Sequence, residues 1–160
     1  MALPSTRRLR ERLEAQLRRD VHLEPALPLA PTAPALSFGI YVDTHLATHA
    51  IVVADLPAAA HIGAAADLIP VGVATTAVRQ HTLPPLLAGR FRSVLEEWPA
   101  LFDRAAGTAD AQIRLYDAVL AGERPPPDVL ALAAAPGRRL DVSVSVRAYG
   151  EGRLSLVLGR

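Results

Sequence analysis

Residues 138–160 read RRLDVSVSVRAYGEGRLSLVLGR and contain the clearest structural pattern in the chain. Valine or leucine alternates with smaller or charged residues on both sides of the Gly-rich segment 149–152. Such alternation is typical of strands that bury one face, and the glycines favour a tight turn, so the pattern predicts an antiparallel hairpin. Each strand is expected to bury one row of side chains: Val142, Val144 and Val146 in the first, and Leu154, Leu156 and Leu158 in the second.

Upstream of this hairpin, the apolar pattern predicts further strands and helices in a mixed order. Residues 37–55 alternate around a short turn at 43–44 and predict a second hairpin. The segments that follow are predicted as a small-residue helix that ends before Pro70, a short helix at 71–81, a long helix that begins near Pro84 or Pro85, a strand at 111–120, and a loop with a short helix at 122–137. The order ββ-α-α-α-β-α-ββ does not alternate strand by helix. We therefore expect residues 37–160 to form a single α+β domain, with helices on one face of a mainly antiparallel sheet.

The long helix includes the segment GRFRSVLEEWPALFDR, residues 89–104. Its apolar residues recur at helical spacing, which predicts that they are buried: Phe91, Val94, Leu95, Trp98, Leu101 and Phe102. Pro99 cannot donate a backbone hydrogen bond, so we expect a kink in the helix at this position. Four polar residues are expected on the exposed side: Arg92, Ser93, Glu96 and Glu97.

Residues 1–22 predict an N-terminal basic amphipathic helix that spans about 6–20. Its apolar stripe is narrow and consists of Leu9, Leu13 and Leu17. This helix could dock on the domain, pair with a second copy, or bind a membrane or nucleic acid. Glutamates dilute its charge and its stripe lacks aromatic residues, so we favour docking or self-association. We predict a homodimer from this stripe and from the open strand edges that a small sheet leaves, and we expect no nucleic-acid partner.

Residues 23–36 form a Pro-rich segment in which Pro25, Pro28, Pro31 and Pro34 occur at every third position. This period matches the three-residue turn of a polyproline II helix. The segment is either a ligand for an aromatic groove or an extended strap that lies across the domain. The repeat lacks a charged anchor, so we favour the strap.

The composition excludes several classes of chemistry. All 17 basic residues are Arg, and the sequence has no Lys, Asn or Cys. This usage is typical of a GC-rich bacterial genome, and it excludes Schiff-base lysines, Cys nucleophiles, thiolate zinc sites and disulfides. The net charge of +1 gives no general attraction to nucleic acids. The sequence has no apolar run near the ~20 residues that span a bilayer and no recognisable cleavable leader, so we expect a cytoplasmic protein without an integral membrane segment.

Four residues support an alternative function, a small enzyme or a ligand- or metal-binding protein: Asp43, His45, His49 and His61. On a strand, His45 and His49 would share a face but lie ~13 Å apart, and Asp43 would join them only through a bulge. His61 lies in the Ala-rich segment and is expected at the boundary of the core. These spacings do not define a metal or cofactor site, and we expect neither.

The segments HIGAAADLIP and SVLEEWPALF, together with the order of predicted elements over residues 37–159, resemble the CheC/CheX-type chemotaxis phosphatase family. This resemblance implies a long helix that presents an acid and, three residues later, an Asn, which together orient water against a phosphorylated aspartate. One register places Ser93 at the acid position and Glu96 at the Asn position. The other register keeps Glu97 as the acid and places Ala100 at the Asn position.

Neither register of the motif contains an Asn, and a carboxylate at that position would repel the phosphoryl group. We therefore expect no phosphatase activity and assign no catalytic residue. The resemblance then implies a non-catalytic protein-interaction domain of CheC/CheX-like fold, in bacterial signalling or motility. Its predicted partner-binding residues are Arg92, Ser93, Glu96 and Glu97.

Overall fold

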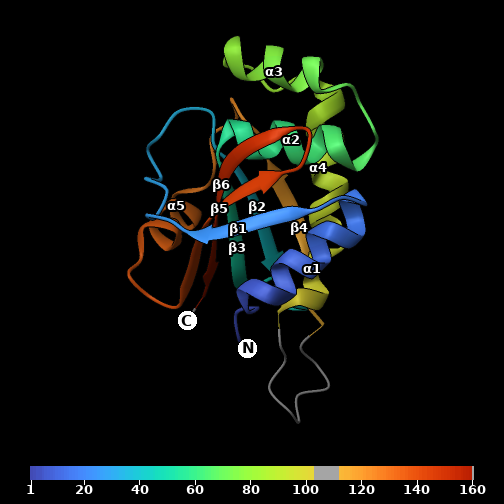
Figure 1. The fold of residues 1–160 in the computed structure, drawn as a ribbon. Helices are drawn as coiled ribbons and strands as arrows, with labels where there is room; N and C mark the ends of the chain where they lie inside the picture. The colour runs from blue at the N-terminus through green and yellow to red at the C-terminus, as the bar shows by residue number, and fades with distance from the viewer. Residues whose placement is uncertain (103–111, 160) are drawn as a thin grey trace.

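The computed structural model describes residues 1–102 and 112–159 (Figure 1). Its elements, in chain order, are α1 (Thr6–Leu17), β1 (Val21–Pro25), β2 (Ser37–Val42), β3 (Thr48–Ala54), α2 (Leu56–Ala66), α3 (Val71–Arg79), α4 (Pro85–Glu96), the 3-10 turn η1 (Trp98–Leu101), β4 (Arg114–Val119), α5 (Pro127–Ala134), β5 (Arg139–Val146) and β6 (Gly150–Leu158). The strands form a six-stranded antiparallel sheet in the order β1-β5-β6-β3-β2-β4. The predicted α+β class is confirmed.

The C-terminal hairpin is confirmed as the pair β5–β6, in which Val146 lies opposite Gly150. Both predicted rows are buried in one core cluster: Val142, Val144, Val146, Leu154, Leu156 and Leu158. The start of β6 crosses α2 very closely, because a Cβ atom at Gly152 would collide with the backbone of Ala58. Glycine at this position therefore lets the hairpin pack directly on the Ala-rich helix.

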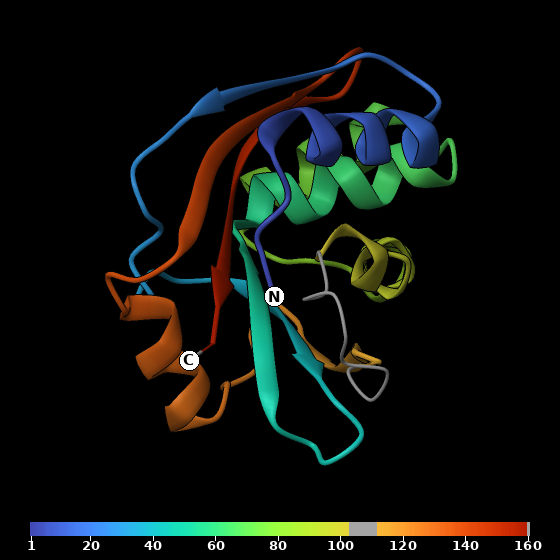
Figure 2. The same cartoon turned by 90° about the horizontal axis from the view of Figure 1, so that it is seen from below.

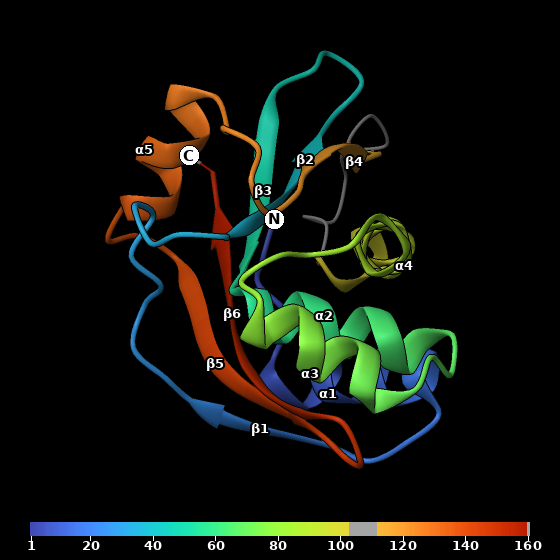
Figure 3. The same cartoon turned by 90° about the horizontal axis from the view of Figure 1, so that it is seen from above.

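The sheet is covered on both faces, which differs from the predicted single layer of helices. Alternate residues of β3 enter different clusters: Val52 contributes to the core below α1, α2 and α4, whereas Ile51 and Val53 pack in a second cluster with Val129 and Ala133 of α5. Figures 2 and 3 show α5 on the opposite side of the sheet from α1, α2 and α4. Because β3 is apolar on both faces, each face requires a cover.

The N-terminal helix docks on the domain, one of the alternatives expected from its sequence. Leu9, Leu13 and Leu17 are at most 1% exposed and belong to the main core. The Ser5 hydroxyl caps α1 by accepting a hydrogen bond from the Arg8 amide, and the helix ends at Leu17, earlier than residue 20. The leucine stripe is therefore already covered within a single chain.

The Pro-rich segment begins in an edge strand that the sequence did not predict. Residues 21–25 form β1 and pair with β5, so the first three residues of the segment 23–36 belong to the sheet. Leu29 and Leu36 then insert into the second cluster, and the Ala26 amide donates to the Asp141 carbonyl. These contacts hold parts of the segment against the domain. The choice between strap and ligand stays a prediction. The division into 1–22, 23–36 and 37–160 stays a prediction.

The predicted kink at Pro99 is wrong, because α4 ends at Glu96 and η1 follows it. In a continued helix, the Leu95 carbonyl would accept a hydrogen bond from the amide of residue 99, which proline lacks. The buried Tyr41 hydroxyl donates to this carbonyl instead, at 2.8 Å. The apolar side is buried as predicted: Phe91, Val94, Leu95, Trp98, Leu101 and Phe102. The last residues of the quoted segment, 103 and 104, lie outside the described residues.

Candidate functional site

The outer side of α4 is defined by four residues: Arg92, Ser93, Glu96 and Glu97. Their contacts divide them into two pairs. The first pair borders β4. The Arg92 guanidinium lies 3.5 Å from a carboxylate oxygen of Glu96 and 3.6 Å from one of Asp117. All three side chains are about half exposed, so these ion pairs contribute little to stability. They leave the charged groups available to a partner.

The second pair borders α1 and α2. Ser93 and Glu97 line a small surface cavity of about 180 Å³. Asp67 and Arg90 also line it and form an ion pair of 3.0 Å. The Ser93 hydroxyl donates to the Gly89 carbonyl at 3.0 Å, a common arrangement for serine within a helix. The outer side of α4 therefore continues into a polar depression.

Gln16 of α1 attaches the N-terminal helix to the end of α4. Its side-chain oxygen accepts a hydrogen bond from Trp98 Nε1 at 2.8 Å. Its side-chain nitrogen donates to the Val94 carbonyl and to a Glu97 carboxylate oxygen, each at 3.0 Å. Sequence reasoning missed this residue, because a single Gln about eighty positions away from its partners leaves no periodic signal.

The position of Gln16 also bears on the motif of the CheC/CheX-type family, in which an acid is followed by an Asn. Gln16 places a side-chain amide beside Glu97, but both of its amide hydrogens are used by the Val94 carbonyl and the Glu97 carboxylate. It therefore has no hydrogen left to position a water molecule. The sequence has no Asn to replace it.

Asp43 and His49 come together at the β2–β3 hairpin, where His49 Nε2 lies 2.7 Å from Asp43 Oδ2. The other Asp43 oxygen accepts from the His45 and Ala47 amides at 2.8 and 3.0 Å. The hydrogen bond with His49 is the main cause that lowers the pKa of Asp43 to about 2. Because each contact closes the turn, this cluster is a structural feature of the hairpin. Within the described residues, no three His, Asp or Glu side chains are grouped to hold a metal ion.

His61 is 8% exposed and lies on α2 against Gly150, whose hypothetical Cβ would meet the imidazole ring. Its Nδ1 is buried without a hydrogen-bond partner. Burial lowers the pKa of His61, and the nearby Asp55 carboxylate only partly opposes this shift. His61 is therefore a packed, neutral core residue, and it is not grouped with Asp43, His45 or His49.

The comparisons with known proteins identify the fold. No protein-family model and no curated protein sequence matches the chain. A chain in the crystal structure of the FliM–SpeE complex from H. pylori matches with a TM-score of 0.61 and 7% identity, over 95% of this chain and 80% of that one. The FliM middle domain from Vibrio alginolyticus matches with a TM-score of 0.54 and 10% identity, over 94% and 86%. This chain has the fold of the FliM middle domain.

CheX from Vibrio vulnificus also matches, with a TM-score of 0.39 and 11% identity, over 96% of this chain and 95% of that one. The structural neighbours therefore include a CheX protein, of the family that the sequence resembles, as well as the FliM middle domain. At these identities the matches establish the fold alone. Among the described residues, none of the helices is long and apolar enough to cross a membrane.

Proposed function

We propose that the chain is a non-catalytic protein-interaction domain of bacterial signalling or motility and that its partner binds the outer side of α4. The fold is the observation that supports this role most strongly. It is the fold of the FliM middle domain, and one of its matches is a chain crystallised in a complex of FliM with SpeE. The CheX match joins it to chemotaxis proteins of the same fold.

The outer side of α4 has the properties expected of a binding surface. Phe91 and Leu95 hold the inner side of the helix in the core with no exposure, so the outer side is presented rigidly. Two large apolar residues on these elements, Leu86 of α4 and Tyr116 of β4, are 53% and 52% exposed. Aromatic and arginine side chains among mixed polar groups are typical of protein interfaces.

The absence of a phosphatase mechanism follows from the residues at this surface. Glu96 and Glu97 bring negative charge to the position where a phosphoryl group would have to approach. The amide of Gln16, which lies beside Glu97, is fully used within the fold. A neutral donor for the attacking water is therefore lacking among the side chains that meet at the end of α4.

A homodimer in the cytoplasm is a separate proposal. The leucine stripe of α1 no longer supports self-association, because it is buried within one chain. The remaining support is that β1 and β4 are the edges of the sheet. Sedimentation over a wide concentration range should detect a dimer, and a 17.0 kDa species at every concentration would exclude it.

One assay tests the proposed function directly. Purified protein is added to a panel of phosphorylated receiver domains, and both complex formation and the rate of dephosphorylation are recorded. We expect no acceleration of dephosphorylation. If the protein accelerates it, and Glu96→Ala or Glu97→Ala removes that acceleration while the exposed control Glu123→Ala does not, the non-catalytic function is wrong.

A further inference from the structure

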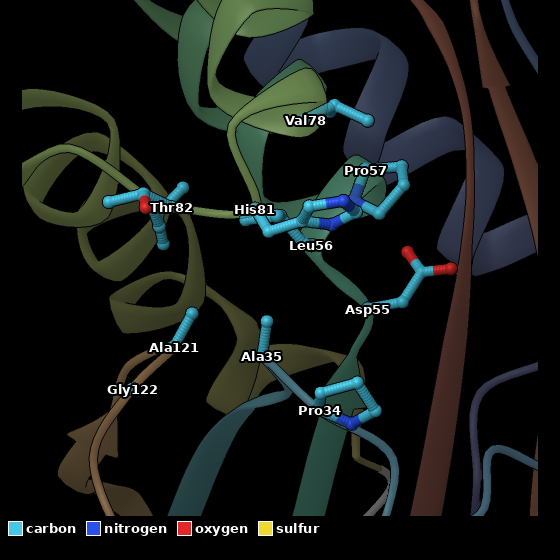
Figure 4. Close-up of a pocket in the computed structure, with 11 residues that line it drawn as sticks. Pro34, Ala35, Asp55, Leu56, Pro57, Val78, His81, Thr82, Ala121 and Gly122 are labelled. Atoms are coloured by element: carbon cyan, nitrogen blue, oxygen red, sulfur yellow. The ribbon is translucent and has the colours of Figure 1, made fainter.

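A cavity of about 550 Å³ lies where four segments that are distant in sequence meet. Figure 4 shows their residues around it: the end of the Pro-rich segment at 34–35, the start of α2 at 55–57, the connection from α3 to α4 at 81–83, and the turn after β4 at 121–122. This volume lies within the ~300–1,000 Å³ typical of small-molecule sites. The cavity uses none of the residues on the outer side of α4, so it is independent of the proposed function.

The backbone is unusual at three positions that line this cavity. Ala35, His81 and Gly122 adopt positive φ angles of 58°, 54° and 97°. This left-handed conformation is unfavourable for residues with a Cβ atom, and Ala has no side-chain hydrogen bond to compensate for it. Such conformations persist where the surrounding structure requires them, and they are common at binding sites. The chain therefore adopts unfavourable backbone geometry at Ala35 and His81, in two of the segments that enclose the cavity, whereas Gly122 has no Cβ penalty at its positive φ.

The side chains around the cavity determine which ligand fits. Most are apolar, and the polar ones are Asp55, His81 and Thr82. Asp55 Oδ1 accepts hydrogen bonds from the Ala58 and Arg153 amides at 2.9 and 3.0 Å, and Figure 4 shows its carboxylate turned away from the centre. The Thr82 hydroxyl donates to a backbone carbonyl of its own loop at 3.2 Å. The His81 imidazole, which can donate or accept, is therefore the group best suited to a ligand.

We propose that this cavity binds a small, neutral, mainly apolar molecule with one polar group that hydrogen-bonds to His81. The apolar walls provide the favourable contact area for such a molecule. An anion would have to lose its hydration beside the negative charge of Asp55. Because the Asp55 carboxylate turns away from the centre of the cavity, a cation would lose its hydration without forming a direct ion pair.

The test uses the full chain and three probes of equal length: octan-1-ol, octanoate and octylammonium. Binding is followed through the backbone amide resonances of Leu83 and Gly122 in NMR titrations. Two variants reduce the cavity, Ala121→Trp and Thr82→Trp. The matched control Ala131→Trp adds the same side chain on the exposed side of α5.

We expect saturable binding of octan-1-ol that is at least about tenfold weaker in both cavity variants and unchanged in the control. His81→Ala should weaken it by about fivefold through loss of one hydrogen bond. If Ala121→Trp does not fold, as judged by circular dichroism, Thr82→Trp decides the result. The proposal is overturned if octan-1-ol does not bind saturably, if the cavity variants bind it as the control does, or if either charged probe binds more tightly.

Discussion

The outer side of α4 and the cavity at the start of α2 are two kinds of surface on one scaffold. The first lies along a helix and is charged, and its Arg92 and Glu96 side chains are about half exposed. The second is concave and mainly apolar, and it is formed by loops with left-handed backbone at Ala35, His81 and Gly122. The scaffold between them is α2, whose first residues line the cavity and whose Gly63 packs against the backbone of α4.

This difference in shape and charge matches the two surfaces to two different proposed functions. A charged helix face suits a protein partner, because its groups keep their hydration until binding and then pair with complementary groups. A preformed apolar cavity suits a small molecule, because little ordering is needed when it binds. Substitutions on the outer side of α4 should therefore affect partner binding, and those in the cavity should affect ligand binding.

The largest change in the free energy of unfolding is expected from Trp98→Ala. This variant tests the buried side of the chain at the end of α4. Trp98 has no exposed surface, and its Nε1 donates to Gln16. Its removal should lower the free energy of unfolding by ~3–5 kcal/mol through the cavity that it leaves. Urea unfolding measures this change.

The matched control is Glu96→Ala on the outer side of the preceding helix α4, which should change the free energy of unfolding by no more than ~0.5 kcal/mol. A loss of ~2 kcal/mol or more in Glu96→Ala would mean that the outer side of α4 stabilises the fold. The assignment of this surface to binding would then be weakened.

Local patterns predicted the elements of the fold but not the contacts between distant segments. The alternation around Val144 and Leu156 predicted the C-terminal hairpin. It could do so because the burial of every second side chain in a strand is visible in a short stretch of sequence. The short strand β1 was missed, because it has five residues and ends in Pro25, which is uncommon inside strands. The contacts of Gln16 and the walls of the cavity depend on residues far apart in sequence, which a single chain without related sequences does not reveal.

Ala35→Gly at the cavity should change the free energy of unfolding less than Trp98→Ala does. Glycine adopts a positive φ without the Cβ penalty of ~1–2 kcal/mol, which should exceed the added entropy of the unfolded chain. The free energy of unfolding should rise by ~0.5–1 kcal/mol in urea titrations. The control Ala131→Gly, in the middle of α5, should lower it by a similar amount. If both variants are destabilised equally, Ala35 does not have the strained backbone that the cavity argument requires.

His61 tests whether α2, which lies between the two regions, stays packed against the core. Because burial lowers its pKa below the ordinary value of 6.5, the unfolded chain binds a proton more readily than the folded chain does. The stability that neutral His61 provides is present above pH ~6.5 and is lost as the pH falls below it. Urea unfolding at pH 7, 6 and 5 should show this loss in the wild type and in the exposed-site control His45→Gln, but not in His61→Gln. A wild-type slope that persists in His61→Gln would assign the effect to another group.

Photocrosslinking in cells of the protein's own source organism tests the proposed binding role of α4 most directly. A photoreactive residue at Ser93 is compared with one at Thr75 of α3, because both are exposed hydroxyl residues that donate to the carbonyl four positions earlier. We expect a defined crosslink to one partner protein from position 93, its loss when Glu96→Arg is added, and no such crosslink from position 75. Equal crosslinking from both positions, or none from position 93, would contradict the proposal that the outer side of α4 binds a protein partner.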